Sequence, residues 1–195
     1  MDWIVPAAIG YFLGSIPFGL LLTRMIGIDI RQVGSGNIGT TNVLRTGNKG
    51  LAAATLLLDA GKGVAAVAIG RWLGGEMGGI VAGTCAFLGH CFPVWLRFRG
   101  GKGVATILGI TFAAAPLAGV IALATWLGGA LVTRYSSVGG MLAAVACPLA
   151  AWAVRDNIGW AIHLAPLAAL LIFLHRDNIA RLRAGTESKI GQKAK

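Results

Sequence analysis

The uncharged stretch GVATILGITFAAAPLAGVIALATWLGGALVT, residues 103–133, decides how this chain folds. It holds 31 consecutive residues without a charged side chain, and Pro116 stands near its middle. As one helix the stretch would be about 46 Å long, whereas the hydrocarbon core of a bilayer is about 30 Å thick. As two helices, each half would be short. Length alone therefore leaves both alternatives open.

The distribution of basic residues favours two elements that turn near Pro116. A single span would put the basic tail, residues 176–195, across the membrane from the basic loop at 24–49. Basic residues collect on the cytoplasmic side of membrane proteins. With two elements, 14 of the 17 basic residues share that side: four in the first loop, three just before the stretch, one just after it and six in the tail. The other three are Arg71, Arg155 and Lys62.

Five further apolar segments complete the predicted fold, an all-α integral membrane protein. Each is close to the roughly 20 residues that a helix needs to cross the hydrocarbon core. They are residues 3–23, 51–70, 77–96, 135–154 and 157–174. With the two halves of 103–133 they predict seven transmembrane or membrane-embedded helices, of which helices 4 and 5 are short. We expect one domain, 1–195, with its N-terminus outside and its C-terminus cytoplasmic.

Composition excludes a soluble monomer, because 56% of the residues are hydrophobic and 12% are charged. The net charge of +10 indicates anionic partners, either lipid head groups or phosphorylated substrates. Nucleic acid is not expected, since basic and aromatic residues do not alternate as they do in proteins that follow a strand. The three cysteines and three histidines form no ligand cluster, so we predict neither a metal site nor a cofactor.

The first polar loop, GSGNIGTTNVLR at 34–45, combines glycines with hydroxyls, amides and a cation. Glycine lets backbone N–H groups converge on an anion, and Arg45 offers a planar fork that matches phosphate oxygens. The loop therefore predicts a phosphate site, the alternative being a solvated connection between helices. Its letters also fit the dinucleotide pattern G-x-G-x-x-G, but about 27 residues between two spans cannot hold a Rossmann sheet. The predicted phosphate contacts are Gly36, Asn37, Thr40, Thr41, Asn42 and Arg45.

The second polar loop, RFRGGKG at 97–103, places Lys102 among glycines just before a helix expected to begin near Val104. Backbone donors and the helix dipole favour an anion at such a position. The loop is not a Walker A motif, because Gly103 stands where Ser or Thr is required. Its alternative interpretation is a positive-inside topology signal. The predicted contacts here are Gly101, Lys102 and Gly103, joined by Ser137 from the third polar loop, 134–140.

Two further groups of polar residues are candidates. Asp59 and Lys62 lie three residues apart, so they share a helix face on which an ion pair would reduce the cost of burial. Lys62 would lie about 16 Å deep, either as the floor of a substrate pocket or as part of a structural pair. His175 and Asn178 share a face beyond the last span, where an imidazole could accept a hydroxyl proton or simply anchor the interface.

Three of these motifs together resemble the signature motifs of the PlsY acyltransferases. They are the loop at 34–45, the Gly100–Gly103 loop preceded by Gly89-His90-Cys91-Phe92-Pro93, and His175 with Asn178 and Glu187. The resemblance covers nearly the whole chain. It implies transfer of a fatty acyl group from acyl phosphate to the 1-hydroxyl of sn-glycerol 3-phosphate. The products would be lysophosphatidic acid and inorganic phosphate, in the first acylation of phospholipid synthesis.

The resemblance also implies roles and a location. The active site would lie on the cytoplasmic face of the bacterial inner membrane. Ser35, Arg45, His175 and Asn178 would be catalytic, the loop at 101–103 would bind glycerol phosphate, and Glu187 would be structural. The partners implied are acyl phosphate, glycerol 3-phosphate and the lipid bilayer, with the enzyme that makes acyl phosphate as a candidate protein partner.

The chemistry of acyl phosphate fits these residues. It is already an activated anhydride, so the enzyme mainly aligns two anions and stabilises developing charge. Arg45 and Lys102 are predicted to hold the phosphates, and either His175 or the donor phosphate would take the hydroxyl proton. No acid and base pair stands beside Ser35, which favours direct transfer over an acyl-enzyme. The alternative function is a membrane transporter of phosphorylated anions, because broken helices also suit carriers.

Overall fold

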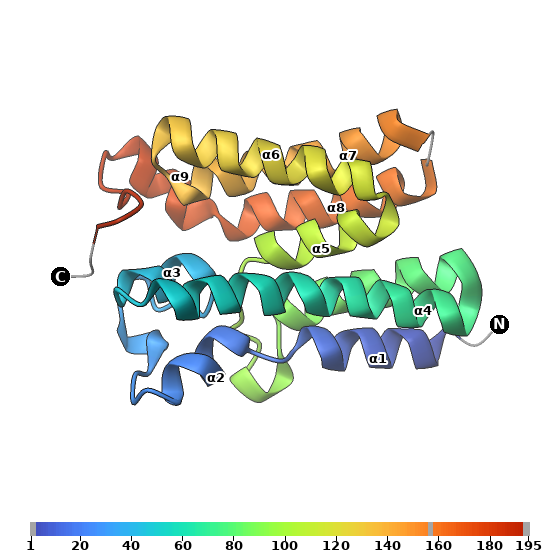
Figure 1. Cartoon of the computed structure of the whole chain (residues 1–195), viewed down its shortest axis with the longest axis horizontal. Helices are drawn as coiled ribbons and strands as arrows, with labels where there is room; N and C mark the ends of the chain where they lie inside the picture. Colours follow the sequence, from blue (N-terminus) through green and yellow to red (C-terminus); the bar gives the residue numbers. More distant parts are fainter. Residues whose placement is uncertain (1–2, 156–157, 193–195) are drawn as a thin grey trace.

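The computed structural model describes residues 3–155 and 158–192, and within these ranges all regular structure is helical. The long helices lie side by side along the long axis of the molecule, and α1 begins at the opposite end of that axis from α9 (Figure 1). One layer contains α1 and α4, the other contains α6, α7 and α8, and α5 lies between them. The elements are α1 (Ile4–Gly14), α2 (Phe18–Arg24), η1 (Ile30–Gln32), α3 (Thr40–Arg45), α4 (Lys49–Cys91), η2 (Val94–Leu96), α5 (Val104–Ala114), α6 (Pro116–Thr133), α7 (Ser136–Arg155), α8 (Ile158–Leu174) and α9 (Arg176–Arg183).

Helix α4 is a hairpin of two antiparallel arms, which correspond to the predicted segments 51–70 and 77–96. Its backbone leaves helical geometry at Gly74 and Gly75, where Gly75 has φ 63°. Lys62 Nζ lies 2.8 Å from His90 Nδ1, although the two residues are 28 positions apart. A straight helix would separate them by about 42 Å. The second arm ends at Cys91 rather than at Leu96, because Pro93 cannot continue the helix.

The first predicted span, 3–23, is broken rather than continuous. It forms α1 and α2, with the break at Ser15–Pro17. Proline lacks an N–H and clashes with the preceding turn, so Pro17 removes a bond from the helical ladder. The carbonyl of Ile16, at this break, accepts one hydrogen bond of 3.1 Å from the backbone N–H of Phe18 and another of 2.9 Å from Lys62 Nζ. A buried cation of α4 thus contacts the backbone where the first span is broken.

The stretch 103–133 forms two elements with the turn at Pro116, as the charge distribution predicts. α5 is short, with 11 residues, and it begins well inside the molecule rather than at its end (Figure 1). α6 has 18 residues and a length of about 27 Å, so the expectation that it too would be short is wrong. It can be longer because it starts at the end of the molecule, whereas α5 starts from a loop that reaches inward.

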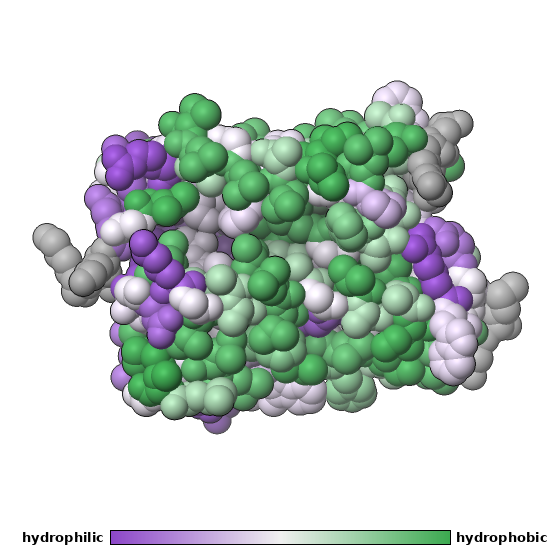
Figure 2. Space-filling view, viewed as in Figure 1, coloured by the Kyte–Doolittle hydropathy of each residue, from purple (hydrophilic) through white to green (hydrophobic). Residues whose placement is uncertain are grey.

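The apolar surface identifies an integral membrane protein. Among residues 3–155 and 158–192, four helical stretches are long and apolar enough to cross a bilayer, and the bent pair α8 and α9 counts as a fifth if it is taken as one span. Figure 2 shows apolar side chains across the middle of one face, with hydrophilic ones gathered toward its two ends. The predicted segment 157–174 corresponds to α8, although Asn157 itself lies outside the described residues. The number of crossings and the orientation remain predictions.

Cysteine labelling in intact cells tests the orientation. The first loop and the tail lie at one end of the molecule and the α4 hairpin turn at the other (Figure 1), and basic residues favour the cytoplasm. In a variant without the native cysteines, Cys at Asn48, Phe98 or Gln192 should react only after the cells are opened. Cys at Glu76 should react in intact cells, and so should Cys at 156, a position outside the described residues. A tail that reacts in intact cells would contradict the orientation.

Candidate active site

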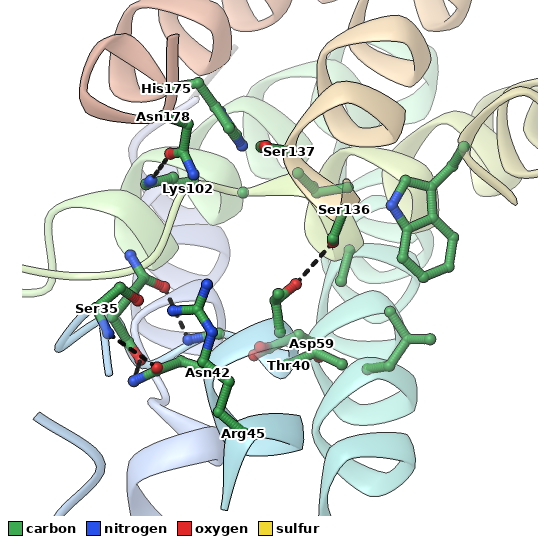
Figure 3. Close-up of a pocket in the computed structure, with 18 of the residues that line it drawn as sticks. Ser35, Thr40, Asn42, Arg45, Asp59, Lys102, Ser136, Ser137, His175 and Asn178 are labelled. Carbon is green, nitrogen blue, oxygen red and sulfur yellow. Dashed lines mark hydrogen bonds between the residues drawn. The ribbon is translucent and has the colours of Figure 1, made fainter. Parts of the chain in front are cut away.

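One pocket brings together residues from all three polar loops and from the junction of α8 and α9. In Figure 3, His175 and Asn178 reach it from one side, Ser35, Asn42 and Arg45 from the opposite side, and Lys102 lies between them. Of the predicted site residues, the following line it: Ser35, Asn37, Thr40, Thr41, Asn42, Arg45, Lys102, Gly103, Ser137, His175, Asn178 and Glu187. Gly36, Lys62 and Gly101 do not.

The wall also contains residues to which the sequence assigned no role. They are Gly39, Leu56, His90, Val104, Ala105, Trp126, Ser136 and Ser188, together with Asp59, which was considered only as the partner of Lys62. Ser136 could have been found from its position beside Ser137. Leu56, His90 and Trp126 lie within apolar runs, where a single residue carries no signal of which way it faces. Within residues 3–155 and 158–192, no group of His, Cys, Asp and Glu side chains could hold a metal ion.

Asn42 organises the first polar loop. Its Oδ1 accepts a bond of 3.1 Å from the backbone N–H of Ser35, and its Nδ2 lies 2.8–3.0 Å from the carbonyls of Ile30, Val33 and Asn37. Asn42 is buried, so these bonds replace water for both ends of its amide. Its contribution to the pocket is therefore the shape of the loop. Asn37 does similar work, because its Oδ1 accepts from Gly39 N at 2.9 Å.

The loop leaves some polar groups for a ligand. Thr40 Oγ1 is buried and has no hydrogen-bond partner within the described residues. A buried hydroxyl without a partner is costly, and it marks a position where a bound group could supply the missing bond. Thr41 is already engaged, since its Oγ1 lies 2.8 Å from Ser136 Oγ and connects the loop to α7. Gly34 must be glycine here, because φ is 54° and a Cβ would lie 2.6 Å from Asn42 Oδ1.

Arg45 is the free cation of the pocket. Its side chain has no hydrogen bond or ion pair with any residue that the structure describes, whereas Arg31, Arg71 and Arg181 each pair with a carboxylate. Burial lowers the pKa of its guanidinium, but a guanidinium stays charged at neutral pH. A partly buried, unpaired guanidinium is a site for an anion.

Lys102 belongs to a chain of hydrogen bonds that ends at Glu187. Its Nζ donates to Asn178 Oδ1, and Asn178 Nδ2 donates to Glu187 Oε1 at 2.6 Å. Glu187 also accepts bonds from Ser137 Oγ at 2.8 Å and from Arg181 Nε at 2.7 Å. Burial lowers the pKa of Lys102, and the nearby cation Arg181 lowers it further. Glu187 thus holds Asn178 in place, and Asn178 directs the ammonium of Lys102.

His175 presents one ring nitrogen to the pocket. Its Nδ1 lies 2.8 Å from the carbonyl oxygen of Leu171, which can only accept, so Nδ1 carries the hydrogen. Nε2 then bears a lone pair in the neutral ring. Burial lowers the pKa of His175 to about 4, because little water reaches the side chain. His175 is therefore neutral at physiological pH and can accept a hydrogen bond from a hydroxyl.

The glycines of the second loop serve packing more than anion binding. The N–H groups of Gly100 and Gly101 donate to the carbonyls of Cys91 and His90, each at 3.0 Å. A Cβ at Gly101 would lie 2.1 Å from the His90 ring, so only glycine allows this approach. The carbonyls of α4 thus occupy the N–H groups of Gly100 and Gly101, whereas an anion at the backbone of Lys102, Gly103 and the start of α5 stays a prediction. Lys102 and Gly103 are the residues of this loop that line the pocket.

Lys62 is surrounded by protein groups and lies behind the pocket rather than in its wall. Its Nζ lies within hydrogen-bond distance of His90 Nδ1, at 2.8 Å, and of the Ile16 carbonyl, at 2.9 Å. Its third contact is an ion pair of 2.7 Å with Asp59 Oδ1, an atom that has no hydrogen bond within the described residues. Of the two interpretations of the Asp59 and Lys62 pair, this geometry favours the structural one.

The fold and the pocket define a multi-pass membrane protein with a site for anions. The family model described as "Glycerol-3-phosphate acyltransferase" matches residues 4–185, and the chain belongs to this family. This confirms the resemblance stated from the sequence motifs.

Individual relatives agree with the family. Glycerol-3-phosphate acyltransferases from Agrobacterium fabrum and Ruegeria pomeroyi are each 56% identical to it, over 96% and 100% of this chain and 91% and 96% of theirs. The crystal structure of PlsY (YgiH), an integral membrane glycerol 3-phosphate acyltransferase, in its glycerol 3-phosphate form matches with a TM-score of 0.91. It is 35% identical, and the match covers 97% of this chain and 96% of that chain. The lysophosphatidic acid form of PlsY matches with a TM-score of 0.90.

The hydrogen bonds of Glu187 predict a pH-dependent stability. Burial opposes ionisation, but bonds from Asn178, Ser137 and Arg181 hold the pKa of this carboxyl below its usual value. A carboxyl with a lowered folded pKa stabilises the fold above its unfolded pKa of about 4.3 and loses that contribution as pH falls. Glu187→Gln should therefore lower the Tm at pH 7 and reduce the loss of Tm on acidification. A pH profile parallel to that of the wild type would contradict this role.

Proposed function

We propose that this enzyme transfers the fatty acyl group of acyl phosphate to the 1-hydroxyl of sn-glycerol 3-phosphate. The products are lysophosphatidic acid and inorganic phosphate, and the reaction is the first acylation of phospholipid synthesis. The observation that carries the proposal is one pocket with two cations from different loops, Arg45 and Lys102, beside the free Nε2 of His175. Both substrates are anions and one is an alcohol, so two cations and a hydrogen-bond acceptor match their chemistry.

The proposed roles follow from the hydrogen-bond donors and acceptors that each side chain does not already use within the protein. Arg45 has its whole guanidinium available, and Lys102 shares one ammonium hydrogen with Asn178 and keeps the others. We assign glycerol phosphate to Lys102 and the donor phosphate to Arg45, with Thr40 adding a hydroxyl. Holding two reactants in one orientation makes the transfer effectively unimolecular. Gly36, Asn37 and Asn42 contribute by shaping the loop that carries Arg45.

The reaction balances without a covalent enzyme intermediate. The 1-hydroxyl oxygen attacks the acyl carbonyl carbon, the carbonyl oxygen gains negative charge, and the bond to the phosphate oxygen breaks as the ester forms. Cations near both oxygens stabilise the charge that develops on them. The hydroxyl proton leaves with the phosphate or passes to His175. Ser35 Oγ has no His or carboxylate partner in the part of the chain that the structure describes, so an activated serine is not supported.

We favour the donor phosphate as the base. A general base works best when its pKa is near the operating pH, and a pKa of about 4 makes His175 a weak one. Its neutral Nε2 can still hold the 1-hydroxyl in line for attack. Asn178 supports this arrangement through Lys102 rather than by taking a proton.

The location follows from the topology. We propose a multi-pass enzyme of the bacterial inner membrane with the pocket open to the cytoplasm, where glycerol 3-phosphate is dissolved. Acyl phosphate is amphiphilic and would be delivered by the enzyme that makes it, a candidate protein partner. The loops and tail predicted to be cytoplasmic hold 14 of the 17 basic residues, which favours anionic substrates on that side.

Donor choice tests the proposal directly. Purified enzyme in detergent or nanodiscs should form lysophosphatidic acid from glycerol 3-phosphate with acyl phosphate and not with acyl-CoA. The rival function, a transporter of phosphorylated anions, predicts instead that labelled glycerol 3-phosphate accumulates unchanged inside proteoliposomes. Product formation with acyl-CoA alone would contradict the proposed donor.

Lys102→Ala should mainly raise the KM for glycerol 3-phosphate. Losing one charge-assisted hydrogen bond costs roughly 1.5–3 kcal/mol, which is on the order of tenfold to a hundredfold in kcat/KM. Lys49→Ala is the matched control, because Lys49 is exposed and does not line the pocket. Equal kinetics for the two variants would contradict a substrate contact by Lys102 and would favour the alternative, that the loop at 97–103 is a positive-inside topology signal.

Substitution of His175 separates the two candidate bases. If His175 orients the hydroxyl, His175→Asn should keep much of kcat, and the wild-type rate should fall as pH drops through the phosphate pKa of about 6. If His175 is the base, both His175→Ala and His175→Asn should lose roughly 10² to 10⁴ in kcat. The wild-type rate would then persist until the pH approaches the lower pKa of His175, about 4. Severe kcat defects in both variants, with normal substrate binding, would overturn our preference.

A further inference from the structure

Asp59, Lys62 and His90, here called the Lys62 cluster, are charged or titratable side chains that the proposed reaction does not use. All three are almost completely buried, with 3–5% of their surface exposed. Taking ions out of water is expensive, and such groups in membrane spans are functional by default unless they serve the fold. Lys62 cannot contact a substrate, because Asp59, His90 and Ile16 surround its ammonium.

The cluster joins three segments that are far apart in sequence. Ile16 lies at the break between α1 and α2, Asp59 in the first arm of α4 and His90 near the end of the second arm. The ammonium of Lys62 contacts all three of these residues. Asp59 and His90 also form part of the pocket wall, whereas Lys62 does not. The cluster therefore adjoins the pocket.

His90 connects the cluster to the loop of Lys102. An ammonium only donates, so His90 Nδ1 accepts from Lys62, and the neutral ring carries its hydrogen on Nε2. That edge of the ring lies against Gly101, where a Cβ would be 2.1 Å from Nε2. The backbone carbonyl of His90 accepts the N–H of Gly101 at 3.0 Å. Gly101 directly precedes Lys102. The orientation of the His90 ring therefore sets the backbone position from which the Lys102 side chain extends.

We propose that the Lys62 cluster positions Lys102 for glycerol phosphate: Lys62 fixes the His90 ring, and His90 fixes the backbone of Gly101. Asp59 supplies the counter-charge that reduces the free-energy cost of burying the ammonium. Asp59, Lys62 and His90 are therefore positioning residues. The inference rests on the proposed role of Lys102, but it also predicts an effect on the loop that is independent of catalysis.

The informative variant is the pair Asp59→Asn with Lys62→Met. Lys62→Met alone leaves the Asp59 carboxylate buried without a partner, which can unfold the protein. The pair removes both charges and nearly preserves the volume. We expect it to fold, to speed hydrogen exchange in the segment 97–103, and to raise the KM for glycerol 3-phosphate roughly tenfold, since a displaced ammonium weakens one charge-assisted bond. The KM for acyl phosphate should stay within about twofold, because Arg45 lies on another loop.

Two comparisons make the result decisive. His90→Asn keeps an acceptor near the position of Nδ1, so it should retain more affinity for glycerol 3-phosphate than His90→Ala and serves if the paired variant does not fold. Glu76→Gln removes an ion pair at the opposite end of the molecule and should leave both the exchange at 97–103 and the KM unchanged. The exchange of α6, which contributes no residue to the Lys62 cluster or to its contacts, reports on general loosening.

Wild-type exchange at 97–103 in the paired variant would overturn the inference, and so would an equal rise in exchange at 97–103 and in α6. Equal changes in the KM for both substrates would also overturn it, because the loss of a purely structural ion pair should affect both substrates alike. The proposed function fails separately: if Lys102→Ala leaves the KM unchanged, the assignment of Lys102 is wrong whatever the exchange shows.

Discussion

The fold depends on one ammonium, Lys62, that makes two hydrogen bonds and one ion pair with protein groups inside a membrane span. In a bilayer a polar group has no water to bind, so every break in a helix and every buried charge must find its partner within the protein. Lys62 meets three such needs at once. It gives the Ile16 carbonyl a donor where Pro17 breaks the first span, neutralises Asp59, and fixes the ring of His90. The same ammonium therefore connects the break in the first span to both arms of the α4 hairpin.

The pocket is organised by the opposite condition, since some of its polar groups are left without a partner. Glu187 and Asn42 are saturated and act as frameworks, one for Lys102 through Asn178 and the other for the loop of Arg45. Arg45 and Thr40 Oγ1 have no partner in the described ranges, 3–155 and 158–192. Groups that a fold leaves unpaired in a buried site are those that a ligand completes. The contrast between saturated and unpaired groups separates the framework from the substrate contacts.

Sequence patterns predict the elements better than they predict which atoms remain available. The run at 103–133, the charge distribution and Pro116 were enough to predict two elements, because length and sidedness are constraints on the whole chain. Pro17 is visible in the sequence, but the contact of the neighbouring Ile16 carbonyl with Lys62, 46 residues away, is not. The glycines at 100–101 have the composition of an anion site, but α4 carbonyls occupy their N–H groups. His90 and Trp126 face the pocket from apolar runs in which periodicity carries no direction. Such assignments need the spatial neighbours of each atom.

The central claim is that this pocket joins two anionic substrates in one direct transfer from acyl phosphate. The most direct measurement follows phosphate release and lysophosphatidic acid formation together, on purified enzyme at concentrations comparable with the substrate. The account predicts one phosphate for each lysophosphatidic acid, and no phosphate release when glycerol 3-phosphate is omitted. A burst of phosphate without glycerol 3-phosphate, with the acyl group retained on the protein, would contradict it.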